Sequence, residues 1–401
     1  MADRPDVRRV GDAVRGEGVG SGVRLSAVLL FVGKCARARG YLRSGGFQPP
    51  HSVGRAWESA ALGARKRTGL SNGPSTRPPT FCATTSPPGL LLDGLSHPTA
   101  SSTQRLRLPA CPLCGGSTFR PVVTVESHPV VRCRSCDLQL TNPQPSDAEL
   151  AAIYGPDYVL AADDSPAHAV IVRSKRATAD HYLDLLVHAG APQGAKLLEI
   201  GCGAGNFLLQ ATQRGYDVTG VEYSPYACAR ARQTLGGVGR VLQGEIEVVA
   251  AEIGTYDIVV LCDVIEHVRQ PADFLRKVLT ALRPGGLLLV VTPSTASWSA
   301  RIMGRRWMEL KPEHLFYFSP ATLTSQLNQT GFQAVALHRG TKLLSLDYVT
   351  AHFEKYPVAG IRATLRLLRA IVPAAWSQRP VRIVASGIIA LARKPANAAR
   401  P

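Results

Sequence analysis

Three closely spaced glycines form the first group of residues whose pattern indicates chemistry. They are Gly201, Gly203 and Gly205. They follow the apolar run 196–200, and glycines in such a position let the backbone turn sharply and let a ligand approach it closely. A dinucleotide fingerprint would place its third glycine at position 206. Asn206 stands there instead, which argues against an NAD-dependent oxidoreductase.

A carboxylate ends the next apolar run along the chain. Residues 217–221 predict a strand, and Glu222 follows it directly. At the tip of a second parallel strand, a carboxylate can accept both hydroxyls of a ribose. We therefore expect the glycine turn and Glu222 to form a cradle for a nucleoside at the carboxyl edge of a sheet.

Acidic and imidazole groups follow a later apolar run, residues 256–261. Asp263, Glu266 and His267 come close together there, after a fourth predicted strand whose end faces the same edge of the sheet. The imidazole of His267 has an intrinsic pKa suited to taking a proton near neutral pH. This segment is therefore a candidate source of a general base.

Four of the nine cysteines form two Cys-x-x-Cys pairs separated by 18 residues. They are Cys111, Cys114, Cys133 and Cys136. This is the spacing of a zinc ribbon, in which four thiolates on two tight turns close a tetrahedral site that is structural, not catalytic. The alternatives are a chance occurrence or a redox pair. The uneven, odd-numbered cysteines favour a metal site over a secreted disulfide framework, and hence a reducing, cytoplasmic setting.

The elements that must position these residues alternate in type. Beyond Lys196, short apolar runs alternate with amphipathic stretches, which predicts an α/β fold with a parallel sheet covered by helices on both faces. The segment 284–286 (Pro-Gly-Gly) predicts a helix stop and a turn into the next strand. The expected strands and helices are 196–200, 207–213, 217–221, 227–235, 240–243, 256–261, 272–282 and 287–291.

The basic charge is concentrated at the start of the chain. The 401 residues hold 46 Lys and Arg against 29 Asp and Glu, a net charge of +17, and residues 1–108 contribute 16 basic against 6 acidic residues. With 15 Gly, 9 Pro and no sustained periodicity, residues 1–108 are predicted to be a disordered basic tail. The zinc ribbon is expected at 109–145 and a helical linker at 146–195, with helical periodicity over 147–158 and 167–189.

Several motifs together resemble the class I S-adenosylmethionine-dependent methyltransferases. They are LLEIGCGAGNF (197–207), VTGVEYS (218–224), YDIVVLCDVIEHV (256–268), ALRPGGLLLVVTPS (281–294), EHLFYFSPATL (313–323) and GF (331–332). The resemblance covers about 200 residues in order. It implies a Rossmann-like domain of seven strands over 196–395, with S-adenosylmethionine as the cofactor.

The resemblance also implies roles for single residues. The glycines would line the methionine part of the cofactor, Glu222 would hold the ribose, and Asp263 would lie near the methionine amine. The adenine would be flanked by Glu245 and Ile246, although that family more often has Asp at the position of Glu245. The expected cofactor-binding residues are Glu199, Gly201, Gly203, Gly205, Glu222, Tyr223, Glu245, Ile246 and Asp263.

The methyl acceptor is expected to be a small molecule or a glycan, with O-methylation favoured over C-methylation. His267 and His314 are the candidate catalytic residues, although in this family the Glu-His pair is often structural. Some relatives, the polyprenyl-hydroxyphenol O-methyltransferases among them, carry a similar acidic cluster as a divalent-metal site. By that likeness Asp263, Glu266, His267 and His314 could hold Mg²⁺ or Mn²⁺.

Two further segments bear on the acceptor and on partners. Residues 294–312 contain Trp298, Trp307 and Met308 and occupy the place of an acceptor-facing loop, or pack in the core. Residues 341–380 predict an amphipathic helical insertion before a last strand at 381–391. Its Arg362, Arg366 and Arg369 share one helical side, which a solvated face explains better than an anionic membrane surface.

Two other classes of protein fit the sequence less well. A nucleic-acid-binding protein would use the ribbon and the basic tail to grip phosphates, but no basic stripe with interleaved aromatic residues supports it in the ribbon. An integral membrane protein is disfavoured because no apolar run reaches 18 residues.

Overall fold

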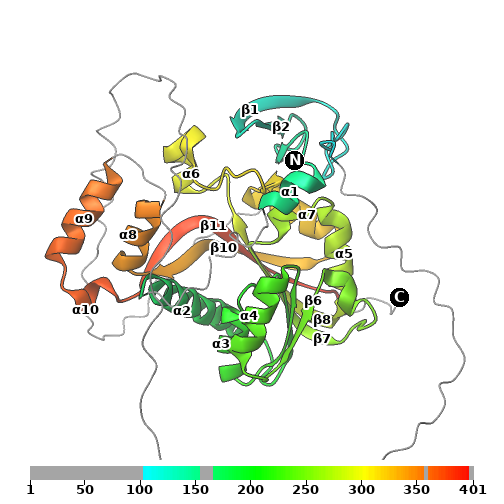
Figure 1. Ribbon diagram of the computed structural model, residues 1–401. Helices are drawn as coiled ribbons and strands as arrows, with labels where there is room; N and C mark the ends of the chain where they lie inside the picture. The colour runs from blue at the N-terminus through cyan, green and yellow to red at the C-terminus, as the bar shows by residue number, and fades with distance from the viewer. Residues whose placement is uncertain (1–102, 154–165, 356–359, 397–401) are drawn as a thin grey trace, which may run out of the picture. The chain divides into compact units, whose positions relative to one another are not determined.

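The computed structural model describes residues 103–153, 166–355 and 360–396 (Figure 1). The predicted tail therefore lies outside the described residues, apart from 103–108. Among these, Leu106 forms a bridge with Gln144, so at least part of 103–108 pairs with the ribbon segment. Part of the expected linker, residues 154–165, also lies outside the described residues.

A seven-stranded sheet forms the centre of the fold, in the order β10-β11-β8-β7-β4-β5-β6. The strands β4, β5, β6, β7 and β8 pair in parallel, whereas β11 runs antiparallel to both β8 and β10. This order confirms the predicted α/β fold with its mostly parallel sheet. The strands are β4 (Lys196–Ile200), β5 (Asp217–Glu222), β6 (Arg240–Gln243), β7 (Tyr256–Cys262), β8 (Leu282–Pro293), β10 (Gln333–Leu344) and β11 (Val381–Arg393).

Helices cover both faces of this sheet (Figure 1). Alternate residues of a strand point to opposite faces, so Leu197 and Leu198 of β4 belong to two different apolar cores. Residues of α2, α3 and α4 complete the core around Leu197, and residues of α5 and α7 complete the core around Leu198. The helices are α2 (Pro166–His188), α3 (Asn206–Gln213), α4 (Pro225–Leu235), α5 (Pro271–Ala281) and α7 (Pro320–Gln329).

The range expected to be a linker contributes directly to the core. Tyr182, Leu183 and Leu186 of α2 are buried in the same cluster as Phe207 and Leu208 of α3. The segment 284–286, expected as a turn, lies within the bounds of β8, and Gly285 has a positive φ of 75° there. A positive φ allows the sharp change of direction that the Pro-Gly-Gly sequence predicts.

A second sheet has four strands, in the order β1-β2-β3-β9. Its first three strands belong to the expected ribbon: β1 (Phe119–Val125), β2 (His128–Cys133) and β3 (Gln139–Thr141). The fourth, β9 (Phe316–Tyr317), lies between β8 and α7 in the chain and pairs antiparallel with β3. Leu138 and Leu140 are buried in the same core as Phe316 and Phe318, so the ribbon and the larger domain share one apolar core.

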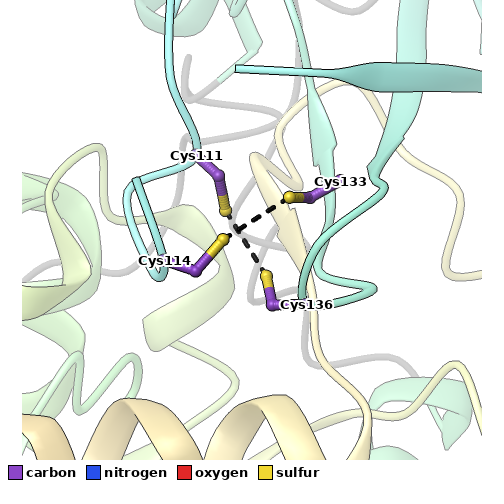
Figure 2. A group of neighbouring side chains, drawn as sticks. All are labelled: Cys111, Cys114, Cys133 and Cys136. Atoms are coloured by element: carbon purple, nitrogen blue, oxygen red, sulfur yellow. Dashed lines mark hydrogen bonds between the residues drawn. The ribbon is translucent and has the colours of Figure 1, made fainter. Parts of the chain in front are cut away.

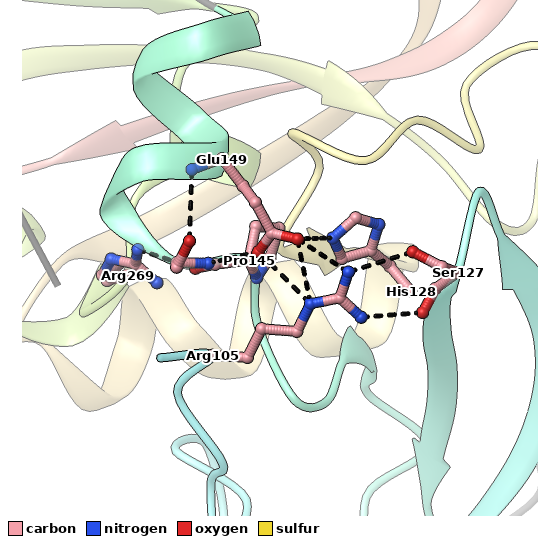
Figure 3. Close-up of polar contacts among 7 residues, drawn as sticks. Arg105, Ser127, His128, Pro145, Glu149 and Arg269 are labelled. Atoms are coloured by element: carbon pink, nitrogen blue, oxygen red, sulfur yellow. Dashed lines mark hydrogen bonds and ion pairs between the residues drawn. The ribbon is translucent and has the colours of Figure 1, made fainter. Parts of the chain in front are cut away.

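The short helix α1 (Asp147–Ile153) follows this sheet and begins with a capping box. The Glu149 backbone N–H donates to Ser146 Oγ at 3.1 Å, and the Ser146 N–H donates to Glu149 Oε2 at 2.8 Å. Arg105 also donates to the Glu149 carboxylate, at 2.7 Å, and Arg269 donates to the Pro145 carbonyl, at 2.8 Å (Figure 3). These contacts hold both ends of the ribbon segment.

The predicted insertion between β10 and β11 is helical, with α8 (Leu346–Lys355), α9 (Ile361–Ile371) and α10 (Ala374–Ser377). Arg366 pairs with Glu354 at 2.6 Å and Arg369 with Asp347 at 2.6 Å. Much of the basic side of α9 is therefore neutralised within the chain. Among the described helices, none is both long and apolar enough to cross a membrane.

Candidate active site

The glycine turn and the acidic strand end meet at the carboxyl edge of the sheet. The Gly203 N–H donates to Glu222 Oε2 at 2.8 Å, and the Gly201 N–H donates to the Val221 carbonyl at 2.8 Å. The Ser224 N–H donates to the other carboxylate oxygen of Glu222, also at 2.8 Å. The turn and the carboxylate thus form one cradle, as the sequence predicts.

Two of the glycines show why the turn needs this residue type. Gly203 has a φ of 52°, and a Cβ placed there would meet no atom within 4 Å, so the backbone is open to a ligand on that side. Gly205 has a φ of 76°, and a Cβ there would lie 3.1 Å from the backbone of Ala231 in α4. The first glycine leaves space, and the second permits close packing of two helices.

Glu199 lies buried at the base of the cradle, 3% exposed, and its Oε2 has no hydrogen-bond partner among the described residues. Burial, and then the nearby charge of Glu222, raise the pKa of the Glu199 carboxyl well above its usual range. An unpaired buried carboxyl is costly unless a cationic or hydrogen-bonding partner approaches it. Glu199 Oε2 is therefore available to accept a hydrogen bond from a ligand bound in the cradle.

The expected adenine-flanking residues lie at the end of the neighbouring strand. β6 pairs in parallel with β5, and the Gly244 N–H donates to the Glu222 carbonyl at 2.9 Å, which brings the next two residues near the cradle. Ile246 is buried and Glu245 is exposed. Tyr223 follows Glu222 directly and is 65% exposed. Its side chain is therefore free to pack against a ligand in the cradle.

Asp263 follows β7 and has a φ of 55°, an uncommon conformation for a residue other than glycine. Its Oδ2 pairs with Lys342 Nζ of β10 at 3.3 Å. Asp263 is the main cause that raises the pKa of the Lys342 ammonium well above its usual range. The sequence did not indicate Lys342, because its pairing with Asp263 depends on contact between distant strands.

Arg176 is a second basic residue near the cradle that the sequence analysis missed. Its Nε donates to Asn206 Oδ1 at 3.4 Å, and Asn206 is the first residue of α3, directly after the glycine turn. Arg176 belongs to α2, in the range expected to be a linker. The position of that helix against α3 is what brings the guanidinium to the turn.

A separate polar cluster joins Glu266, His267 and His314. Each offers one ligand atom, and these atoms all lie within 4.8 Å of one another; Asp263 is not part of this converging group. The two imidazole rings are 4.7 Å apart in an edge-to-face arrangement. His267 Nδ1 lies 3.1 Å from the Glu313 carbonyl, and Thr292 donates to Glu266 Oε2 at 2.9 Å.

Burial determines the charge of this cluster. It lowers the pKa of His267 to about 4 and that of His314 well below the usual range, so both imidazoles are neutral at pH 7. Burial also raises the pKa of Glu266 to about 8. Glu266 Oε1 and His314 Nδ1 have no hydrogen-bond partner among the described residues. The cluster therefore presents uncharged groups with lone pairs in a low-dielectric setting.

The aromatic residues of the expected acceptor loop have different surroundings. Trp307 is 5% exposed and packs near Tyr317 of β9, so it is part of a small apolar core. Trp298 of α6 (Trp298–Met303) is 41% exposed and donates to the Val384 carbonyl at 2.9 Å. Of these two residues, Trp298 is the one exposed to solvent.

The four cysteines converge at the tip of the four-stranded sheet (Figure 2). The Sγ atoms of Cys111 and Cys136 are 3.6 Å apart, as are those of Cys114 and Cys133. A tetrahedral zinc with Zn–S bonds of about 2.3 Å would hold its sulfurs about 3.8 Å apart, so the donor set fits.

The two cysteine turns repeat the same backbone pattern. The Gly115 N–H donates to the Cys111 carbonyl at 2.8 Å, and the Asp137 N–H donates to the Cys133 carbonyl at 3.1 Å. Gly115 and Asp137 both have positive φ, 74° and 64°. This repetition directs each pair of thiols toward the same point.

A family model described as a methyltransferase domain matches residues 173–337. A ubiquinone biosynthesis O-methyltransferase of Pseudomonas aeruginosa is 37% identical over 168 residues, which cover 40% of this chain and 72% of that protein. The mitochondrial ubiquinone biosynthesis O-methyltransferase of Schizosaccharomyces pombe is 35% identical over 107 residues, 25% of this chain and 39% of that one.

A third relative, the ubiquinone biosynthesis O-methyltransferase of Acinetobacter baylyi, is 27% identical and is covered over 66% of its length. The chain thus spans less than two thirds of two of these three relatives. Among solved structures, an S-adenosylmethionine-dependent methyltransferase of Archaeoglobus fulgidus is 18% identical. The alignment covers 54% of this chain and 94% of that one, with a TM-score of 0.36.

Proposed function

Because the chain belongs to the class I S-adenosylmethionine-dependent methyltransferases, we propose that it moves the methyl group of S-adenosylmethionine to a hydroxyl oxygen of a small molecule. The observation that carries this proposal is the cradle, in which the Gly203 N–H and Glu222 meet at 2.8 Å. The names of the curated relatives favour oxygen over carbon as the acceptor atom.

The residues of the cradle fit this cofactor. The two oxygens of Glu222 each accept one backbone N–H and keep lone pairs for the ribose hydroxyls. Arg176 lies where it can pair with the carboxylate of the methionine part, and Glu199 and Asp263 supply acceptors for its ammonium. The bound cofactor supplies an activated methyl on a sulfonium, so the chain needs to align the acceptor and exclude water.

The acceptor hydroxyl must also lose its proton, and the Glu266–His267–His314 cluster is the proposed place. Both imidazoles are neutral at pH 7, so each keeps a ring nitrogen lone pair that can accept a hydrogen bond from a hydroxyl within reach. In this proposal His267 and His314 orient the hydroxyl oxygen for in-line attack on the methyl carbon, and one of the two imidazoles takes the proton as the C–O bond forms and the bond from the methyl carbon to sulfur breaks.

A second candidate role for the same cluster is to bind a divalent cation. Two observations favour it: one ligand atom from each of Glu266, His267 and His314 lies within 4.8 Å of the others, and Glu266 and His314 each have a buried polar atom with no hydrogen-bond partner among the described residues. Such a cation, Mg²⁺ or Mn²⁺, would be held by Glu266, His267 and His314 and would lower the pKa of a coordinated hydroxyl. Activity that survives exhaustive chelation, with zinc shown to remain on the cysteines, contradicts this role.

We assign the four-cysteine cluster a structural zinc, on the fit of its sulfur spacing. Reduced cysteines in this arrangement favour a cytoplasmic location for the protein. We propose that the methyl acceptor is a small molecule or a glycan.

Mass-spectrometric screening tests the proposed reaction. Purified protein is incubated with S-adenosylmethionine and fractionated cell extract, and products are sought that gain the mass of one CH₂ unit. The expected result is such a gain on a hydroxyl compound with wild type and a strong reduction with Glu222→Ala. A gain on carbon would favour C-methylation, and failure of the wild type to bind S-adenosylmethionine would overturn the proposal.

A further inference from the structure

The loop that carries His314 is held from two sides by backbone hydrogen bonds. On one side, the Leu315 N–H donates to the Glu266 carbonyl at 2.8 Å. On the other side, the Thr141 N–H donates to the Leu315 carbonyl at 2.9 Å. Thr141 adds a third bond, because its Oγ1 donates to the His314 carbonyl at 2.9 Å. The ribbon strand β3 thus contacts the peptide of a candidate catalytic residue directly.

These bonds are protected from water. Thr141 is 1% exposed, His314 3% and Leu315 0%. In such a setting solvent does not replace a lost donor, and a buried carbonyl without a partner is costly. The side chain of Thr141 is therefore important to the position of the His314 backbone.

The contact also connects two distant parts of the sequence. Thr141 ends β3, in which Gln139 pairs with Tyr317 and Leu140 with Phe316. At its start, β3 lies close to the cysteine cluster, because the Cys133 N–H donates to the Leu138 carbonyl at 2.9 Å. Backbone hydrogen bonds thus run from the cluster in Figure 2 to the site of His314.

We propose that Thr141 is a positioning residue for methyl transfer: its hydrogen bonds to His314 and Leu315 fix the His314 imidazole against Glu266 and His267. The inference rests on the proposed function, because it takes the imidazole cluster as the place where the acceptor hydroxyl is oriented. Thr141 itself acts through the backbone and does not touch the acceptor.

Three variants separate this role from a general effect on folding. Thr141→Val keeps the shape of the side chain but removes the Oγ1 donor, and Thr141→Ser keeps the donor. Thr124→Val makes the same change at an exposed position of β1 and serves as the matched control.

Hydrogen exchange of the full-length chain, followed by mass spectrometry, reports on the loop without any acceptor. We expect the peptide covering residues 312–318 to exchange roughly five- to tenfold faster in Thr141→Val. In Thr141→Ser and Thr124→Val, we expect the peptide 312–318 to exchange at the wild-type rate. The peptide that covers β5 should exchange at the wild-type rate in all three variants. Unchanged exchange at 312–318 in Thr141→Val overturns the proposal.

Kinetics test the catalytic consequence, using the acceptor found in the extract screen. Thr141→Val is expected to lower kcat about tenfold or more, with an unchanged Kd for S-adenosylmethionine, and Thr141→Ser to restore kcat. Faster exchange with an unchanged kcat also overturns the proposal. A wild type that binds no S-adenosylmethionine refutes the proposed function instead, and the exchange result is independent of that failure.

Discussion

Glu222 accepts one backbone N–H from Gly203 in the glycine turn and one from Ser224 at the start of α4, so its carboxylate is fixed before any ligand binds. We expect Glu222→Ala to weaken binding of S-adenosylmethionine by about 1.5–3 kcal/mol, because hydrogen bonds to a charged group are lost. Titration calorimetry measures this change. Asp273→Ala, which removes an exposed carboxylate from α5, is the control, and equal affinities for both variants would contradict the assignment.

Glu199 is expected to influence stability and binding in opposite directions. Its folded-state pKa is raised above the unfolded value of about 4.3, so its contribution to stability is complete below that pH and declines as the pH rises. Glu199→Gln should therefore raise the Tm of the ligand-free protein at pH 7 to 8, by less at pH 5, while weakening cofactor binding. A Tm difference independent of pH would show that ionisation of Glu199 is not the cause.

At the scale of single elements, the start of α1 depends on the ion pair between Arg105 and Glu149 (Figure 3). Hydrogen bonds from Arg105, and then the N–H of Ser146, lower the pKa of Glu149 to about 2. The stabilisation is thus present above about pH 4.3 and is lost as the pH falls toward 2. Both side chains are about a third exposed, so the effect is screened and modest.

The corresponding experiment compares urea unfolding of wild type and Arg105→Gln at pH 6 and at pH 2.5. Wild type is expected to be more stable at pH 6, with the difference shrinking at pH 2.5. Arg120→Gln, which removes a more exposed arginine from β1, serves as the control. A difference that grows as the pH falls would reverse the assigned sign.

The cysteine turns should hold stoichiometric zinc in protein purified from zinc-supplemented medium. Plasma mass spectrometry is expected to find zinc in wild type and in Cys228→Ala, whose thiol is buried in α4, but not in Cys133→Ser. Loss of a structural zinc removes a large part of the folding free energy of such a module. Zinc-free wild type with an unchanged Tm would contradict the structural role.

Local signals in the sequence were enough to place the glycine turn, Glu222 and the four cysteines, because each lies at a turn or a strand end. The contribution of β9 could not be predicted, since two residues, Phe316 and Tyr317, give no measurable periodicity and pair with β3 only through the tertiary fold. Arg176 was missed for a related reason: its helix looked like a linker until its packing against α3 was known.

At the scale of the whole molecule, the two sheets share a core in which Leu140 packs with Phe316 and Phe318. We therefore expect the described parts of the ribbon and of the larger domain to unfold in a single cooperative transition, without earlier melting of the ribbon. Differential scanning calorimetry tests this with wild type and Cys133→Ser. The variant should show one transition at a lower Tm, whereas two separated transitions in wild type would indicate an independent module.

The pairing of β3 with β9 sets an order of events during synthesis. Thr141 leaves the ribosome 173 residues before the carbonyl of His314 that it will bind. Until then, Leu138 and Leu140 lack the aromatic side chains that later cover them. Metal bound early by the four cysteines would hold the β1–β3 segment folded until β9 is made. The imidazole cluster can assemble only after most of the polypeptide has been made.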